Sequence, residues 1–114
     1  MRHIEDSLAI AVAQLLTLIL RPGVVFSHIP NGGKRNKREA GRLKAMGVRP
    51  GFADIILLAE SRAYFIELKA PISGRQSEAQ RGFQLAVQAE SFPYAIARDI
   101  DAVHEQCKAW GLTR

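Results

Sequence analysis

A chain of 114 residues is long enough to fold as one domain with a real hydrophobic core, and it leaves little room for a second lobe. Its 47% hydrophobic and 24% charged residues are typical of a soluble globular protein, and 16 Lys and Arg against 11 Asp and Glu give a net charge of +5, which favours polyanions such as nucleic acid. The single cysteine, Cys107, excludes an internal disulfide and is expected to be an ordinary helix residue in a reducing cytoplasm, and no Cys/His cluster suggests zinc.

The first predicted element is a helix over residues 4–20. Its first turn is acidic at Glu5 and Asp6, where the helix dipole favours negative charge, and Arg-Pro-Gly at 21–23 ends it. The apolar stretch over 8–20 is interrupted by polar residues, is too short to span a bilayer, and follows acidic rather than basic residues. We therefore expect a buried helix, and neither a membrane span nor a signal peptide.

The remaining elements alternate between strands and helices. In chain order they are a strand at 24–29, a turn at 30–33, a basic loop and short helix at 34–46, strands near 53–59 and 63–69, a loop at 71–76, a helix from 77 to 90, a strand at 94–98 and a helix at 100–110. This order predicts an α/β fold in which helices flank a central mixed β-sheet, with residues 1–114 in a single domain.

The two central strands are apolar runs joined by a polar break, which predicts an antiparallel hairpin. A two-residue turn at Ser61–Arg62 pairs Asp54 with Lys69. A turn at Glu60–Ser61 pairs Asp54 with Glu67 instead. Because side chains alternate between the faces of a strand, both registers place two carboxylates and an ammonium on one side of the sheet. A one-residue change in turn length would separate them.

Charged side chains at the ends of apolar strands are expensive to desolvate unless something compensates. Two nearby carboxylates repel each other, and a divalent cation is the simplest remedy. Their hard oxygen ligands suit Mg2+ or Mn2+. Lys69 could orient or deprotonate a water, or stabilise negative charge on a phosphorane. The alternative is structural, with Glu67 and Lys69 as an edge-strand ion pair and Asp54 as a turn residue.

A strongly basic segment precedes the hairpin, over residues 31–49. It contains one acid, Glu39, which is most simply an ion-pair partner for nearby arginines, and seven basic residues: Lys34, Arg35, Lys37, Arg38, Arg42, Lys44 and Arg49. Such a cluster would attract a phosphate backbone in a salt-dependent manner, and Gly32 and Gly33 would let backbone amides approach a phosphate closely. A solvated basic face is the alternative.

The predicted helix at 77–90 begins with a polar motif. Ser77 and Gln80 match a capping box, which accounts for Gln80 on its own and leaves a catalytic or substrate-positioning role open. Ser73, Gly74, Arg75 and Ser77 could add phosphate contacts at this helix N-terminus.

Other polar and aromatic residues have ordinary structural explanations. Glu5 would normally be a solvent-facing acid that helps its helix begin, and His28 a half-buried strand histidine with its hydrogen bonds satisfied. The aromatic residues expected to pack in the core or an interface are Phe83, Phe92, Tyr94 and Trp110.

The pattern Gly51-Phe-Ala-Asp54 followed by Ile66-Glu67-Leu-Lys69 resembles the bipartite signature of the PD-(D/E)XK nucleases, with Ala53 where proline is usual. The wider context is similar to the VRR-NUC branch of that superfamily over roughly residues 3–100. Three blocks in order carry this likeness: His28-Ile-Pro-Asn-Gly-Gly-Lys-Arg35, Glu39-Ala-Gly-Arg-Leu-Lys-Ala-Met-Gly-Val-Arg-Pro-Gly51 and Gly74-Arg-Gln-Ser77-Glu-Ala-Gln80.

The resemblance implies a restriction-endonuclease-like core and a metal site. Asp54 and Glu67 would bind the catalytic Mg2+ or Mn2+, with the Leu68 carbonyl as a further ligand. Glu5 matches a glutamate that the family places on its first helix, so the resemblance assigns it to the metal site as well.

The resemblance also assigns the catalytic helpers and the surface that holds the substrate. Lys69 would assist the attacking water, and Gln80 matches the glutamine that the family places on the helix after the core motif. The residues expected to contact nucleic acid are His28, Asn31, Gly32, Gly33, Lys34, Arg35, Arg38, Arg42, Ser73, Arg75 and Ser77.

The function implied is a metal-dependent, structure-selective DNA endonuclease that leaves a 5′-phosphate and a 3′-hydroxyl. Stand-alone members of the family are thought to cut branched DNA such as four-way (Holliday) junctions as homodimers, and a two-fold dimer would place symmetric sites on two strands. A nucleic-acid-binding module that keeps the fold without cleaving is the alternative. A sequence-specific endonuclease of restriction type ranks below both, since nothing resembles an added recognition domain.

Overall fold

The computed structural model describes residues 4–30 and 37–114, and at residues 4 and 5 the backbone alone. The predicted order of helices and strands is confirmed, with ends that shift by a few residues. The elements are α1 (Ile4–Ile19), β1 (Val25–His28), α2 (Lys37–Ala45), β2 (Ile55–Ala59), β3 (Arg62–Leu68), α3 (Glu78–Ala89), β4 (Tyr94–Ala97) and α4 (Ile100–Ala109).

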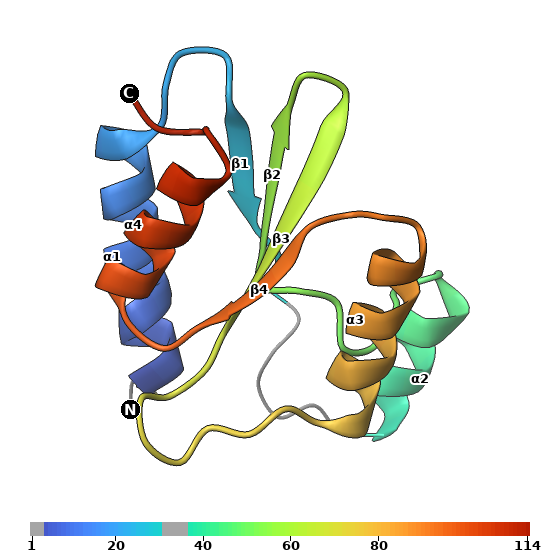
Figure 1. Cartoon of the computed structure of the whole chain (residues 1–114). Coiled ribbons are helices and arrows are strands. Elements are labelled where there is room, and N and C mark those ends of the chain that lie inside the picture. Colours follow the sequence, from blue (N-terminus) through green and yellow to red (C-terminus); the bar gives the residue numbers. More distant parts are fainter. Residues whose placement is uncertain (1–3, 31–36) are drawn as a thin grey trace.

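The four described strands form one sheet in the order β1-β2-β3-β4. The β1–β2 and β2–β3 pairs are antiparallel and the β3–β4 pair is parallel, so the sheet is mixed. Helices α1 and α4 cover one side of this sheet and α3 lies on the other (Figure 1). The predicted α/β fold, a mixed sheet flanked by helices, is thereby confirmed.

The hairpin adopts the second of the two registers left open by the sequence. Ile55 lies opposite Ile66 and Ala59 opposite Arg62, so Glu60–Ser61 is the two-residue turn. Both turn residues have positive φ, 53° and 64°, as a type I′ hairpin turn requires. This register brings Asp54, one residue before β2, level with Glu67.

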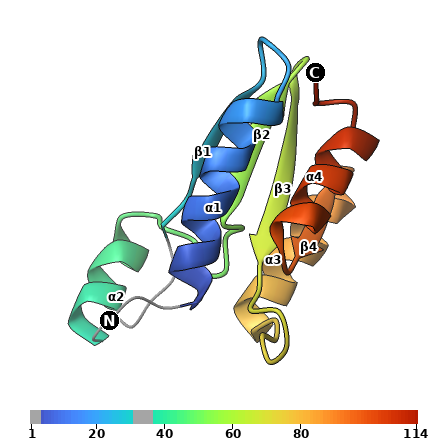
Figure 2. The same cartoon turned by 90° about the vertical axis from the view of Figure 1, so that its left-hand side faces the viewer.

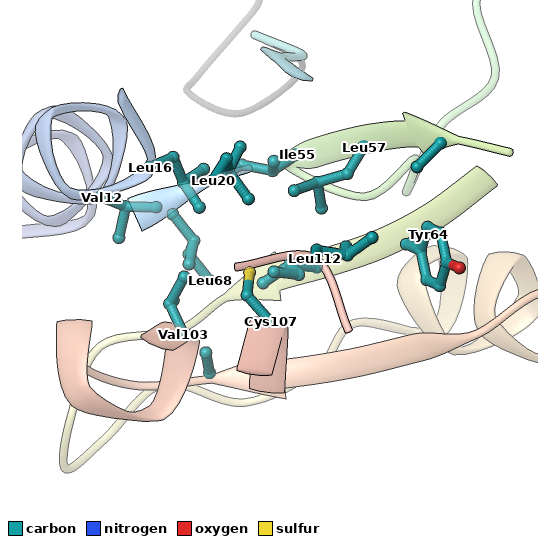
Figure 3. Close-up of a cluster of buried hydrophobic side chains, with 13 residues drawn as sticks. Val12, Leu16, Leu20, Ile55, Leu57, Tyr64, Leu68, Val103, Cys107 and Leu112 are labelled. Carbon is teal, nitrogen blue, oxygen red and sulfur yellow. The ribbon is translucent and has the colours of Figure 1, made fainter. Parts of the chain in front are cut away.

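The main core lies between the sheet and the pair α1 and α4 (Figure 3). Alternate side chains of β2 and β3 face this layer, and α1 contributes residues at helical spacing, such as Val12 and Leu16, followed by Leu20 directly after the helix. Cys107 lies in α4, as predicted, where it is fully buried, and burial raises the pKa of its thiol to about 11. In the part of the chain described, no helix combines the length and apolar character needed to cross a membrane.

A smaller aromatic cluster packs on the opposite face of the sheet, under α3. Phe83 of α3 is buried against Phe65 of β3 and Phe52, with ring centroids 5.4 and 4.3 Å away. The side chains of Glu67 and Lys69 belong to this same face because they follow Phe65 at intervals of two. The aromatic cluster therefore packs at one end of this face, and Glu67 and Lys69 lie at the other end.

Candidate active site

Asp54 is anchored to the strand that carries the second carboxylate. Its Oδ2 accepts a hydrogen bond of 2.6 Å from the backbone N–H of Leu68. Burial raises the pKa of Asp54, the Leu68 hydrogen bond opposes that shift, and the negative charge of Glu67 adds to it. Two carboxylates thus lie at the same end of the β2–β3 pair, and the ionised form of one is costly there without a nearby cation.

Glu67 is almost completely buried, with 1% of its surface exposed. Its Oε1 accepts hydrogen bonds from the Tyr94 hydroxyl and from Gln76 Nε2, the latter at 3.1 Å. Within the described residues, Oε2 has no hydrogen-bond donor, and Lys69 Nζ lies 3.7 Å from it, beyond ordinary hydrogen-bond length. Buried Glu67 therefore presents one oxygen with two hydrogen-bond donors and one oxygen with none from the described residues.

Lys69 is held by the start of α3. The side chain is buried, and its Nζ donates a 2.6 Å hydrogen bond to Gln80 Oε1. The same oxygen accepts the backbone N–H of Ser77 at 2.8 Å, while Gln80 N donates to Ser77 Oγ at 3.1 Å. The capping box is confirmed, and it coexists with a direct contact to Lys69, so the two readings of Gln80 are compatible.

Close backbone packing fixes the loop between Lys69 and α3. A Cβ at Gly74 would lie 2.6 Å from the Ala70 nitrogen, so only glycine permits this approach. Arg98 Nη1 donates to the carbonyls of both Ala70 and Gly74, at 2.9 and 2.8 Å. On the other side of α3, a Cβ on Gly51 would overlap the backbone of Ala79. These contacts position Gln80 and Gln76 over the charged end of the sheet.

The donor set fits a divalent cation of the Mg2+ or Mn2+ type. The observation that carries this fit is the unpartnered Oε2 of buried Glu67, with the Asp54 carboxylate level with it across the hairpin. Hard carboxylate oxygens are the ligands that both cations prefer. Among residues 4–30 and 37–114 no group of three or more His, Cys, Asp and Glu residues is placed to hold a metal, so the described chain supplies two acids.

Two further ligands expected from the sequence remain predictions. Glu5 lies in the first turn of α1, and its side chain falls outside the described part of the chain. Leu68 buries its side chain in the main core and turns its amide toward Asp54, which leaves the role of its carbonyl as a ligand untested.

Three polar residues of the site were not expected from the sequence. The sequence predicts only a packing role for Tyr94; its ring does lie near Phe83, 6.3 Å between centroids, but its hydroxyl donates to Glu67. Burial, reinforced by that hydrogen bond, raises the pKa of the Tyr94 hydroxyl. Gln76 and Gln84 complete the group, since Gln76 Nε2 also donates to Gln84 Oε1 at 2.7 Å.

The described basic residues expected to contact nucleic acid are exposed. Helix α2 has no buried residue and stands apart from the sheet (Figure 2), so Arg38 and Arg42 point into solvent. The residues Ser73, Arg75 and Ser77 are exposed around the start of α3. Asn31, Gly32, Gly33, Lys34 and Arg35 lie outside the described residues.

One expectation about this surface is wrong. His28 is exposed rather than half-buried, because β1 is an edge strand and His28 is its last residue. It nevertheless lies at the same end of the sheet as the two acids, since Ile29 N donates to the Asp54 carbonyl at 2.6 Å.

Fold and site together define an α/β domain with an acidic pair and a buried lysine at one end of a mixed sheet. A solved structure described as a VRR_NUC domain protein has the same fold, with a TM-score of 0.77 and 23% sequence identity over 96% of this chain and 89% of that one. The chain therefore has the VRR-NUC fold, and the restriction-endonuclease-like core is confirmed. No protein-family model matches the sequence, and no curated protein is similar to it.

Proposed function

We propose that this chain is a divalent-metal-dependent DNA endonuclease. The observation that carries the proposal is the arrangement of Asp54, Glu67 and Lys69, in which a buried carboxylate oxygen lies 3.7 Å from a buried lysine and has no hydrogen-bond donor among the described residues. A binding module has no need for such a costly arrangement, because a buried carboxylate oxygen without a hydrogen-bond donor destabilises the fold. The VRR-NUC fold supports the same reaction class, since the similar solved structure is named for a nuclease domain.

Different residues of the chain would have different roles in phosphodiester hydrolysis. Asp54 and the free oxygen of Glu67 would hold the cation, joined by Glu5 and the Leu68 carbonyl. When bound, the cation supplies Lewis acidity toward the phosphate and lowers the pKa of water. Lys69 presents a positive charge that stabilises negative charge on the phosphate, and Gln80 fixes where that charge lies.

Hydrolysis adds water to phosphorus and breaks the bond to the 3′-oxygen. That oxygen takes a proton and leaves as a hydroxyl, while the phosphate stays on the 5′ end of the other fragment. Lys69 is close enough to Glu67 to serve also in orienting the attacking water.

Basic side chains near the site would hold the DNA backbone. Exposed Arg38 and Arg42 on α2, together with Arg75 before α3, supply phosphate contacts, and the net charge of +5 attracts the polyanion from a distance. A single copy offers little surface for a branched substrate. We therefore infer a two-fold homodimer that acts on four-way or other branched DNA, with one site for each of two strands.

A cleavage panel tests this function. Single-stranded, duplex, flap and four-way junction DNA are incubated with the purified chain in Mg2+, Mn2+ or EDTA, with Asp54→Asn as the inactive control. We expect metal-dependent nicking of branched DNA that is absent in EDTA and in the control. Binding of branched DNA without any nick in either metal would instead establish a binding module of the same fold.

A further inference from the structure

The two oxygens of Glu67 have different surroundings, although they are chemically equivalent in a free carboxylate. Oε1 accepts two hydrogen bonds, and Oε2 accepts none from the described residues. The terminal torsion of a glutamate side chain is broad, so nothing within Glu67 itself selects one orientation of the carboxylate plane. The selection comes from its neighbours.

Those neighbours form a chain of hydrogen bonds in which only one assignment of donor and acceptor atoms is consistent. An ionised carboxylate can only accept, so Gln76 must present its amide nitrogen to Glu67. The same nitrogen lies 2.7 Å from the side chain of Gln84, which must therefore present its oxygen. Both hydrogens of the Gln76 amide are then used, one on each acceptor.

Tyr94 supplies the second donor from a different part of the fold. It begins β4, which pairs in parallel with β3, and Tyr94 lies level with Phe65, two residues before Glu67 on the same face. Gln76 reaches Glu67 from the loop before α3. Two donors from independent elements, a strand and a loop, thus converge on a single oxygen.

We propose that Tyr94 and Gln76 are positioning residues that fix the carboxylate plane of Glu67, so that Oε2 faces the divalent cation held with Asp54. Gln84 acts one step further out, by setting the orientation of the Gln76 amide. This inference rests on the proposed metal site and assigns to it three residues that do not touch the cation. Hydrogen-bond partners of metal ligands typically contribute about 10- to 100-fold in metal affinity.

The chain offers a matched control. It contains two tyrosines, and Tyr64 lies on the opposite face of the sheet, with its ring 5.2 Å from that of Trp110. Tyr64→Phe and Tyr94→Phe remove the same atom from the same type of residue, one in the main core and one beside Glu67. Gln76→Leu removes the second donor at similar side-chain volume, and because Gln76 lies in a loop it tests the idea even if Tyr94→Phe destabilises the fold.

The experiment measures Mn2+ binding by electron paramagnetic resonance on the full chain without DNA. We expect Tyr94→Phe and Gln76→Leu each to raise the Kd for Mn2+ about tenfold or more, with Tyr64→Phe unchanged. Cleavage by both variants should return toward the wild-type rate as Mn2+ is raised, which a general loss of structure would not allow.

Two outcomes overturn the inference in distinguishable ways. If wild type binds Mn2+ through Glu67, as Glu67→Gln would show, but both variants bind as tightly as Tyr64→Phe, the positioning role is wrong and the metal site stands. If wild type does not bind Mn2+ at all, the proposed function fails and this inference fails with it.

Discussion

Replacing Gly51 with alanine tests how the chain holds α3 beside Lys69. Gly51 has a φ of +78°, and a Cβ there would overlap the backbone of Ala79, one residue before Gln80. Backbone cannot move aside as the end of a flexible side chain can, so either the loop before β2 or the first turn of α3 must shift. Gly51→Ala therefore tests whether this backbone contact sets the position of Gln80, which accepts the hydrogen bond from Lys69.

Two separate costs determine how much Gly51→Ala destabilises the fold. A side chain in the left-handed region costs about 1–2 kcal/mol, and forcing extra volume into a packed contact costs about 1–3 kcal/mol more. Gly111 is a close control because its φ is +77° and nothing lies within 4 Å of the corresponding Cβ. Gly111→Ala should therefore show only the first cost.

Thermal denaturation followed by circular dichroism measures the difference. At about 4 °C per kcal/mol for a domain of this size, Gly111→Ala should lower Tm by about 4–8 °C and Gly51→Ala by about 8–20 °C. Cleavage by folded Gly51→Ala should also fall, by up to about 100-fold, because misplacing a catalytic group by about 1 Å has that effect. Equal losses of Tm in the two variants would refute the contact between Gly51 and α3.

Three further predictions concern charge. Lys69→Ala should abolish cleavage while DNA binding in a gel-shift assay stays nearly intact, and an equal loss of binding would contradict the division of roles. Arg38→Ala should weaken DNA binding and reduce the slope of log K against log salt by about 1, whereas Arg62→Ala, at the far end of β3 from the site, should change neither. Because burial raises the pKa of Asp54, the folded protein binds that proton more tightly than the unfolded chain, and metal-free stability should fall as pH rises from the ordinary aspartate pKa through the raised one. Asp54→Asn should remove this fall and raise the metal-free Tm at neutral pH; a lower Tm for Asp54→Asn at neutral pH would contradict the cost assigned to the buried charge.

The order of elements follows from sequence because apolar periodicity and helix-ending residues are local signals. The sequence does not select the register of the hairpin, because Glu60–Ser61 lacks the Asn or Gly that usually marks a type I′ turn. Both registers place the same charged residues on one face of the sheet, so the predicted site does not depend on which register forms. The structure then selected the pairing that sets Asp54 level with Glu67.

The donors to Glu67 could not be predicted because they depend on distant pairing. Tyr94 reaches Glu67 only through the parallel register of β3 and β4, and 27 positions separate the two residues. Gln76 depends on a loop whose path is set by Gly74 and Arg98. The error at His28 has a similar origin, since its exposure follows from β1 being an edge strand, which sequence alone does not reveal.

The most direct test of the central claim is the position of a bound cation. Crystals of the chain grown with Mn2+ should show an anomalous peak about 2.1 Å from Glu67 Oε2 and from an oxygen of Asp54, with Oε1 still bound by Tyr94 and Gln76. A peak on Oε1, or no peak between the two acids at saturating Mn2+, would contradict the account.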